Sequence, residues 1–498
     1  MKMNKYIILL SFTASSLLVG CNKNYLDTKP SNAILPEDVY ATIASLNSAI
    51  TANYLATFDY TPVGGGGAMH DSYGQKSIDL ANDLMGNDMV VHAQGFGWYN
   101  ADYNYTAWTR PTGVNTRSSI TWTFYYEIIK QANLLLDAYS GQIPTTDKQS
   151  ILGEAYAIRA WAYFGLINNF QQTYKGNEDK KGVPLYTTRS PAKGRGTVAE
   201  VYAQIIKDLT TSESLLEGKT RSSKQRIDIS VVRGIRARVA LVMNEWAIAA
   251  DYANKARSAP GYQLMTNAVY NSRSGFSSIS NTEWMWGAFI PADQATIFAS
   301  FFAHIDATQF GYAQLGGQKK ITKSLYDRIS SGDVRKLVFR APGTGTDILP
   351  DYTQTKFAVP TVGSWAADYL YMRIAEMYLI EAEALARQNK DAEARTVLET
   401  LIKQRFPGYS ASAFSSTDLV DEILTQRRIE LWGEGFSLFD IKRTNAGLNR
   451  PTGSGNHGLP SLNPVVFTQP DASPLFLMRI PQTEIDNNSE LTPGDQNP

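Results

Sequence analysis

Cysteine and histidine are scarce in this chain of 498 residues, which has a single cysteine, Cys21, and four histidines. One cysteine excludes an intramolecular disulfide and leaves no thiol in the body of the chain for a Cys/His nucleophilic pair. The histidines never stand at the spacing that zinc sites use with each other; they are His70, His92, His304 and His457. The sequence therefore predicts no cofactor and no catalytic residues. It also predicts no metal site, although a structural cation at His70 and Asp71, completed from elsewhere, stays open.

An excess of charge of one sign is also missing, because 47 basic side chains stand against 47 acidic ones. Removing residues 1–20, which carry Lys2 and Lys5 and no acid, leaves 45 basic side chains and the same 47 acidic ones. Such a balance gives no electrostatic reason to bind nucleic acid. The glycine run at 64–67 is followed by no Gly-Lys-Ser/Thr, so it predicts a flexible loop tip and not a phosphate-binding loop.

Long hydrophobic runs are absent, and the apolar stretch at 6–19 is shorter than the roughly 20 residues that a membrane-spanning helix needs. This stretch follows a short basic start and matches a secretory signal. The residues Leu-Val-Gly-Cys at 18–21 look like a bacterial lipobox. We therefore expect a signal peptide over 1–20, lipid on the Cys21 thiol and an extended tether over 21–35. The alternative is an ordinary signal peptide with a chance cysteine.

Apolar residues at helical spacing dominate the remainder of the chain. The predicted helices start near 36 and include about 119–140, 147–170, 198–216, 369–386 and 419–431. Thr197 and Glu200 predict a capping box at the start of one of them, and 475–480 predicts a strand. The pattern favours a mainly α protein whose helix pairs resemble tetratricopeptide hairpins, in one domain over 36–498.

Aromatic residues are plentiful, with 9 Trp, 27 Tyr and 20 Phe. Two regions, about 57–115 and 259–365, lack the helical pattern and mix aromatic residues with glycine and other loop-forming residues. Long loops in an otherwise ordered protein are usually where function is found. We therefore expect the ligand-binding residues in these two regions.

Six segments resemble, in chain order, motifs of the SusD/RagB family of outer-membrane lipoproteins. They lie at 21–27, 125–133, 153–164, 371–382, 427–443 and 480–485. One departure is Ser437, where many members have arginine. The resemblance implies an α-helical scaffold of four tetratricopeptide-like helix pairs at the surface of the outer membrane. It also implies a SusC-like TonB-dependent transporter as partner, to which such proteins deliver glycans, or peptides in the RagB branch.

The charged residues within these motifs alternate with large apolar ones on helices. We interpret them as buried or half-buried ion pairs that hold helices in register, because breaking such a pair strands a charge. These residues are Arg159, Arg373, Glu376, Glu381, Arg427, Arg428, Glu430 and Glu434.

Aromatic rings bind sugars through the C–H faces of the pyranoses, while amides, carboxylates and arginine bind the hydroxyls. Segment 96–110 alternates such residues densely. In starch-binding members of the family, ligand aromatics come from the corresponding loop region and from a mid-chain loop. The predicted glycan contacts are Trp98, Tyr99, Asn100, Trp108, Arg110 and Trp284, with Asp71 and Tyr73 as helpers and Trp286, Phe310 and Tyr312 as further mid-chain candidates. The alternative is that some of these rings anchor loops to the scaffold.

The favoured function is a surface protein that captures oligosaccharides and delivers them to the transporter, without being an enzyme. A peptide-binding RagB-type member, or a non-catalytic protein-interaction scaffold, is the alternative. A glycoside hydrolase would need two carboxylates about 5–10 Å apart across the sugar bond. The loop carboxylates leave that possibility open; they are Asp71, Asp79, Asp83, Asp88 and Asp102.

Overall fold

The computed structural model describes residues 40, 42–59, 69–93, 95–106, 116–139, 144–458 and 466–498. The predicted signal peptide and tether, with Cys21, lie outside the described residues, and so do Trp108 and Arg110. Within the described ranges, no helix is both long enough and apolar enough to cross a lipid bilayer.

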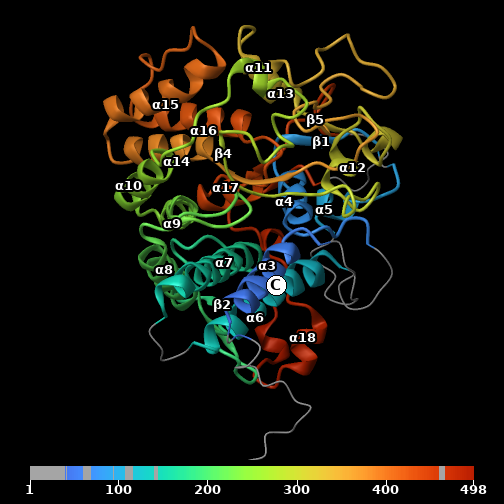
Figure 1. The fold of residues 1–498 in the computed structure, drawn as a ribbon. Helices are drawn as coiled ribbons and strands as arrows, with labels where there is room; N and C mark the ends of the chain where they lie inside the picture. The colour runs from blue at the N-terminus through green and yellow to red at the C-terminus, as the bar shows by residue number, and fades with distance from the viewer. Residues whose placement is uncertain are drawn as a thin grey trace, which may run out of the picture.

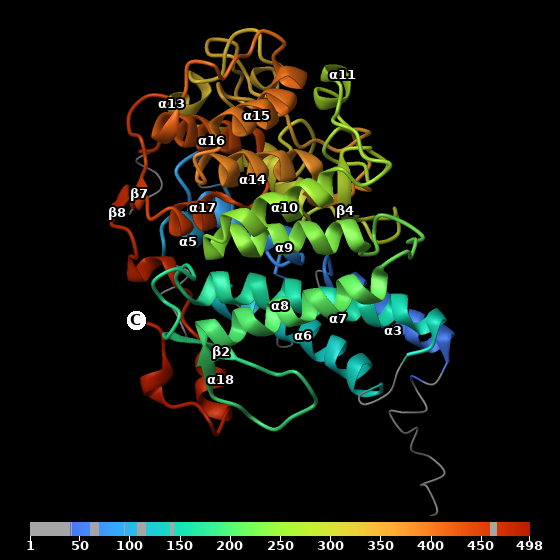
Figure 2. The ribbon, with the colours of Figure 1, turned by 90° about the vertical axis from the view of Figure 1, so that its left-hand side faces the viewer.

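A stack of long helices forms the scaffold, and neighbours in the stack pack against each other in nearly chain order. Its members are α3 (Ile43–Ala56), α6 (Arg117–Asp137), α7 (Thr146–Phe170), α8 (Val198–Leu216), α9 (Ile229–Met243), α10 (Trp246–Arg257), α14 (Ile374–Ala386), α15 (Asp391–Arg405) and α16 (Ser416–Glu430). Figure 2 shows them in layers, with α6 and α7 low in the view and α14, α16 and α15 high. The prediction of a mainly α fold is confirmed.

The strands are short and form two-stranded antiparallel sheets. The pairs are β1 (Met89–Val91) with β5 (Lys319–Ile321), β2 (Lys181–Pro184) with β3 (Arg195–Thr197), β4 (Trp284–Ala288) with β6 (Tyr369–Arg373), and β7 (Leu448–Asn449) with β8 (Thr468–Gln469). The short helices are α4 (Gln75–Leu84), α5 (Asn100–Tyr103), α11 (Asn267–Tyr270), α12 (Phe301–Ile305), η4 (Ala313–Gly317), α13 (Lys323–Tyr326), η5 (Val334–Lys336), α17 (Ser437–Arg443), η6 (Pro474–Phe476), α18 (Gln482–Asn487) and η7 (Pro493–Asp495).

The two loop-rich regions predicted from the sequence meet at one side of the scaffold. Strand β1 of the first region pairs with β5 of the second, with Met89 opposite Ile321. The pairing continues past the strand, where the His92 N–H donates to the Gln318 carbonyl (2.9 Å). Figure 1 shows α4, α5 and α12 near this sheet. Residues more than 200 positions apart in the chain therefore contribute to one surface.

The predicted capping box at α8 is confirmed. The Thr197 hydroxyl accepts from the Glu200 N–H (3.1 Å), and the Glu200 carboxylate accepts from the Thr197 N–H (2.7 Å). Two donors that would otherwise lack partners at the helix start are thereby satisfied, which fixes where α8 begins.

Two predicted elements are wrong in type. The first five residues of the predicted helix 369–386 form strand β6, and α14 begins only at Ile374. Aromatic residues at 369 and 371 suit a strand, and pairing with β4 overrides the helical periodicity that continues through them. The predicted strand at 475–480 is instead a 3-10 turn, η6, followed by a loop, because Pro474 fits the first turn of a helix.

The interpretation of the motif charges as ion pairs is confirmed, since all eight have an oppositely charged partner. Arg159 pairs with Asp208 at 2.7 Å, and Glu376 pairs with Arg238 at 2.6 Å. Among the eight, only Arg428 keeps substantial exposure, at 40% of its side chain. The family motifs therefore hold the scaffold together.

Candidate functional site

Rings from four separate segments gather where the two loop-rich regions meet. Each segment lies just before a short helix, so the helix start sets the direction of its side chains. We call this group the aromatic platform; its members are His70, Phe96, Trp98, Phe298, Phe310 and Tyr312.

The rings of the platform stack in a continuous series. His70 lies between Trp98 (ring centroids 5.4 Å apart) and Phe298 (5.8 Å, planes within 3°). Tyr312 contacts both of these outer rings, at 5.8 and 5.1 Å, and its hydroxyl forms a hydrogen bond with Nδ1 of His70. Phe96 meets the edge of Tyr312 at 5.3 Å. Offset and edge-on contacts at these separations are the favourable aromatic geometries.

A buried layer supports the platform from beneath. The Tyr99 hydroxyl donates to the Tyr73 hydroxyl (2.5 Å), and His304 stacks on Tyr312 with centroids 4.9 Å apart. His304 Nε2 also bonds the backbone carbonyl of His70 (2.7 Å). Burial, together with the positive charge of Lys319, holds the pKa of His304 well below its usual value. A neutral imidazole therefore sits under the rings at physiological pH.

Arg117, at the start of α6, fixes the segment that carries Trp98 and Tyr99. Its guanidinium binds Asp71 and Asp102, each at 3.0 Å, and lies 4.9 Å from the ring centroid of Tyr99. Tyr99 itself has a left-handed backbone (φ 66°) just before α5. This conformation costs roughly 1–2 kcal/mol for a residue with a side chain, and the surrounding ring and charge contacts offset that cost.

Exposure separates the residues that can meet a ligand from those that cannot. Phe96 is 66% exposed and Phe310 54% exposed, which is unusual for phenylalanine. The other four platform residues are half-buried. Tyr73 and Tyr99, predicted as contacts, are almost fully buried and belong to the supporting layer.

Trp284 and Trp286 are corrections to the predicted contact set. Both are fully buried in β4. The indole N–H of Trp284 donates to the Gly275 carbonyl (3.2 Å), and that of Trp286 donates to the Gln225 carbonyl (3.1 Å). Rings enclosed in this way stabilise the core and present no face to a ligand. These two residues therefore fit the alternative that some of the predicted rings pack on the scaffold.

The structure brings three predicted residues, Trp98, Phe310 and Tyr312, into the platform. Asn100 and Asp71 lie next to it and are half-buried. Sequence reasoning did not single out Phe96, Phe298 or His70 as contacts. Phe96 lies inside the aromatic segment 96–110. His70 was considered only as part of a cation site, and nothing in the local sequence marked Phe298.

Within the described residues, no group of three or more metal-binding side chains is close enough to hold an ion. Asp102 and Oδ2 of Asp71 are both bound to Arg117, at 3.0 Å each, whereas Oδ1 of Asp71 has no hydrogen-bond partner among the described residues.

Lys319 of β5 gives the protein a predicted pH dependence. It is buried, its Nζ donates to the Gly317 carbonyl (2.6 Å), and burial lowers its pKa to about 7. An unfolded lysine titrates near 10.4, so between these two pKa values the unfolded state binds more protons. The free energy of unfolding therefore rises with pH by up to about 1.4 kcal/mol per pH unit.

Lys319→Met should remove this contribution. The stability advantage of the variant, measured by urea unfolding, should be largest near pH 7 and shrink towards pH 10; a constant difference would contradict the prediction.

The structure is thus an α-helical scaffold that presents partly exposed rings from several loops at one surface. Two family models match the chain: one described as "Starch-binding associating with outer membrane" over residues 24–241, and one described as "SusD family" over 351–498. Together they cover most of the sequence, and the chain belongs to the SusD family.

Individual relatives agree with this assignment. SusD-like protein P38 of Formosa agariphila is 23% identical over 386 residues, which is 66% of this chain and 72% of that protein. A SusD-like carbohydrate binding protein of Bacteroides vulgatus is 27% identical, with a TM-score of 0.76 over 92% of this chain and 98% of that one. Surface glycan-binding protein A of Bacteroides thetaiotaomicron, solved in complex with laminarihexaose, is 18% identical, with a TM-score of 0.68 over 91% and 99%.

Proposed function

We propose that this protein captures oligosaccharides at the cell surface, using the aromatic platform as its binding surface. The observation that carries the proposal is the partial exposure of stacked rings, above all Phe96 and Phe310, on a rigid support. A ring face provides contact area to a pyranose with little loss of side-chain entropy. The carbohydrate-binding relatives support the same class of ligand.

Delivery to a SusC-like TonB-dependent transporter follows from the family as part of the same proposal. Lipid on Cys21 would tether the protein to the outer membrane, and the tether at 21–35 would place the scaffold next to the transporter. In this role the protein binds and releases its ligand unchanged, so the proposal includes no catalytic step.

Glycan binding by Phe310→Ala tests the platform. Losing one stacking ring should weaken binding about fivefold to tenfold, because an aromatic contact contributes roughly 1 kcal/mol. Calorimetric titration of the purified protein with a panel that includes laminarihexaose would measure this change. Leu337→Ala is the matched control, since Leu337 is also exposed (69%) and lies outside the platform.

The outcomes separate the alternatives. If the unchanged protein and Phe310→Ala bind the glycan with equal affinity, the platform is not the binding site. Chromatography of the oligosaccharide after long incubation should show no shorter product, and a shorter product would favour the hydrolase.

Peptide binding is the second candidate, and one feature favours it. The most exposed platform rings are phenylalanines, which have no polar edge, and exposed Ile297 and Leu315 adjoin platform segments in the sequence. Apolar side chains of a peptide would suit such a surface. The same calorimetric titration with a set of peptides tests this candidate. Binding of a peptide together with no binding of any glycan would replace the glycan proposal by this one.

A further inference from the structure

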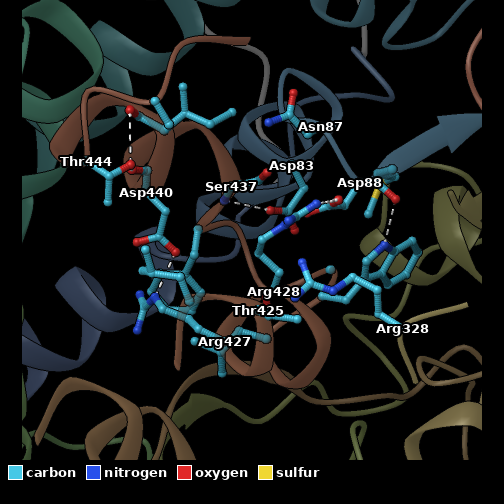
Figure 3. A pocket seen from close by; sticks show the side chains of 18 of the residues that line it. Asp83, Asn87, Asp88, Arg328, Thr425, Arg427, Arg428, Ser437, Asp440 and Thr444 are labelled. Carbon is cyan, nitrogen blue, oxygen red and sulfur yellow. Dashed lines mark hydrogen bonds and ion pairs between the residues drawn. The ribbon is translucent and has the colours of Figure 1, made fainter. Parts of the chain in front are cut away.

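A cavity of about 400 Å³ opens between α16, α17 and the segment around β1, and it shares no lining residue with the aromatic platform. Its volume lies within the roughly 300–1,000 Å³ that small-molecule sites have. Figure 3 shows its charged side chains, which come from segments far apart in the sequence; the ones that matter here are Asp83, Asp88, Asp440, Arg328, Arg427 and Arg428.

Three carboxylates in the wall already have their partners. Arg428 binds both oxygens of Asp88, at 2.8 and 2.5 Å. Asp440 accepts from Arg427 (2.7 Å) and from Arg443 (2.6 Å). The Asp83 carboxylate accepts two backbone N–H groups, those of residues 435 (2.8 Å) and 437 (3.1 Å). These acids therefore offer little further capacity to a positively charged ligand.

The arginines, in contrast, keep unused donors. Arg427 is buried, and its Nη1 has no acceptor among the described residues. Arg428 uses Nε and Nη2 on Asp88, and its side chain is 40% exposed. Arg328 is exposed at the rim, and no acid in the described part of the chain lies within ion-pair distance of it. A buried donor without an acceptor is costly, so an oxygen supplied by a ligand would stabilise this wall.

We propose that this cavity is a second ligand site, which binds a small oxyanion-bearing molecule such as an acidic sugar through Arg328, Arg427 and Arg428. Planar guanidinium groups match the geometry of carboxylate and sulfate oxygens. Asp421, exposed at the rim and also lining the cavity, opposes the anion. The cavity is large enough for a sugar ring to accompany the charged group.

The site can be tested by titrating the purified protein with glucuronate, inorganic sulfate and glucose. Ligand-observed NMR would monitor binding in each titration. Glucuronate should bind and glucose should not. Arg328→Gln should weaken glucuronate binding about tenfold, because it removes a charge-assisted contact without touching a buried ion pair. Asp421→Asn should strengthen it severalfold, since it removes the opposing charge. Lys207→Gln, an exposed change on α8 outside the cavity, should have no effect.

The sulfate arm identifies the source of the charge. Displacement of glucuronate by sulfate would show that an oxyanion without a sugar ring is sufficient for binding. If sulfate does not displace glucuronate, the sugar ring also takes part in binding. Either result agrees with the proposal. Absence of glucuronate binding at tens of millimolar, equal binding by Arg328→Gln, or equal binding of glucose would overturn it. Binding of glycan at the platform is measured separately, so either proposal can fail alone.

Discussion

Arg373→Met should lower the free energy of unfolding by about 3–5 kcal/mol, the cost of removing one partner from a buried ion pair. Methionine fills a similar volume, so the loss would report the missing charge and not a cavity. Urea unfolding followed by circular dichroism would measure the change, with loss of soluble protein on expression as the extreme result.

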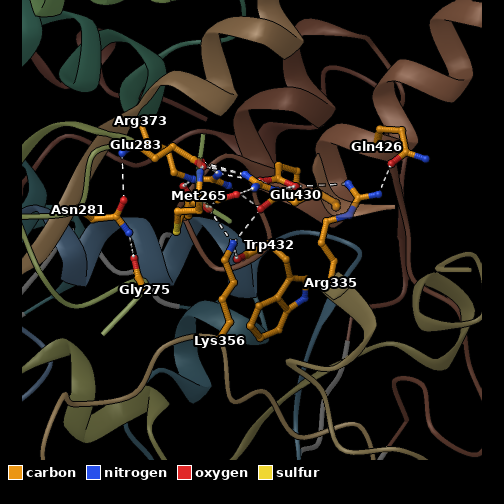
Figure 4. A network of polar contacts seen from close by, with 12 residues as sticks. Met265, Gly275, Asn281, Glu283, Arg335, Lys356, Arg373, Gln426, Glu430 and Trp432 are labelled. Atoms are coloured by element: carbon orange, nitrogen blue, oxygen red, sulfur yellow. Dashed lines mark hydrogen bonds and ion pairs between the residues drawn. The ribbon is translucent and has the colours of Figure 1, made fainter. Parts of the chain in front are cut away.

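The reason lies in the charge network around Arg373, shown in Figure 4. Its guanidinium contacts Glu283 (2.5 Å), Glu430 (2.7 Å) and Glu434 (2.8 Å). Arg405 also forms ion pairs with Glu283 and Glu430, at 2.9 and 3.0 Å, so these two carboxylates each contact both arginines. Burial alone would raise the pKa of Glu434, but Arg373 and Lys356 outweigh it and hold the value at about 2. Without Arg373, three buried carboxylates would lose a partner at once.

Arg387→Met is the matched control, because Arg387 is 27% exposed and its partner Glu383 keeps a second arginine, Arg443. It should cost about 1 kcal/mol or less. Adding Glu434→Gln to Arg373→Met should recover part of the lost stability, since one stranded charge is removed. Equal losses for Arg373→Met and Arg387→Met would mean that the network does not stabilise the fold.

Helix periodicity and the family motifs were sufficient for the scaffold. The capping box of Thr197 and Glu200 followed from local chemistry, which acts within a few residues of the chain. The extent of α7 followed from the helical spacing of its apolar residues. The strand at 369–373 did not follow, because its partner β4 lies about 80 positions away and strand pairing is a tertiary contact. Local sequence patterns predict the structure that neighbouring residues determine. They miss structure that depends on contacts with distant segments.

The same limit explains the candidate site. Composition found the aromatic segment that contains Trp98, yet it could not distinguish an exposed ring from a buried one. Trp284 is enclosed in the core, whereas Phe310 reaches solvent, although both stand in mid-chain regions of similar composition. His70 and Phe298 lie far apart in the sequence, and only the tertiary structure brings their rings to a centroid distance of 5.8 Å.

Gly74→Ala should be the second strongly destabilising change, with a loss of at least about 3 kcal/mol from a left-handed backbone and a steric clash combined. Gly74 has φ 73°, and an added Cβ would lie 2.1 Å from the Thr57 carbonyl oxygen. That oxygen cannot easily move, because it accepts hydrogen bonds from the Gln75 N–H (2.8 Å) and the Tyr371 hydroxyl (3.0 Å).

Gly176→Ala separates the two causes. Gly176 also has a positive φ (85°), but an added Cβ would meet nothing within 4 Å, so only the conformational cost of about 1–2 kcal/mol should appear. Thermal unfolding of both variants would measure the difference. Tyr73, next to Gly74, supports Tyr99 beneath the platform, so Gly74→Ala should also weaken glycan binding while Gly176→Ala leaves it unchanged. Equal destabilisation by the two changes would mean that α4 shifts to admit the methyl group, and the support beneath the platform would then be less rigid than its contacts indicate.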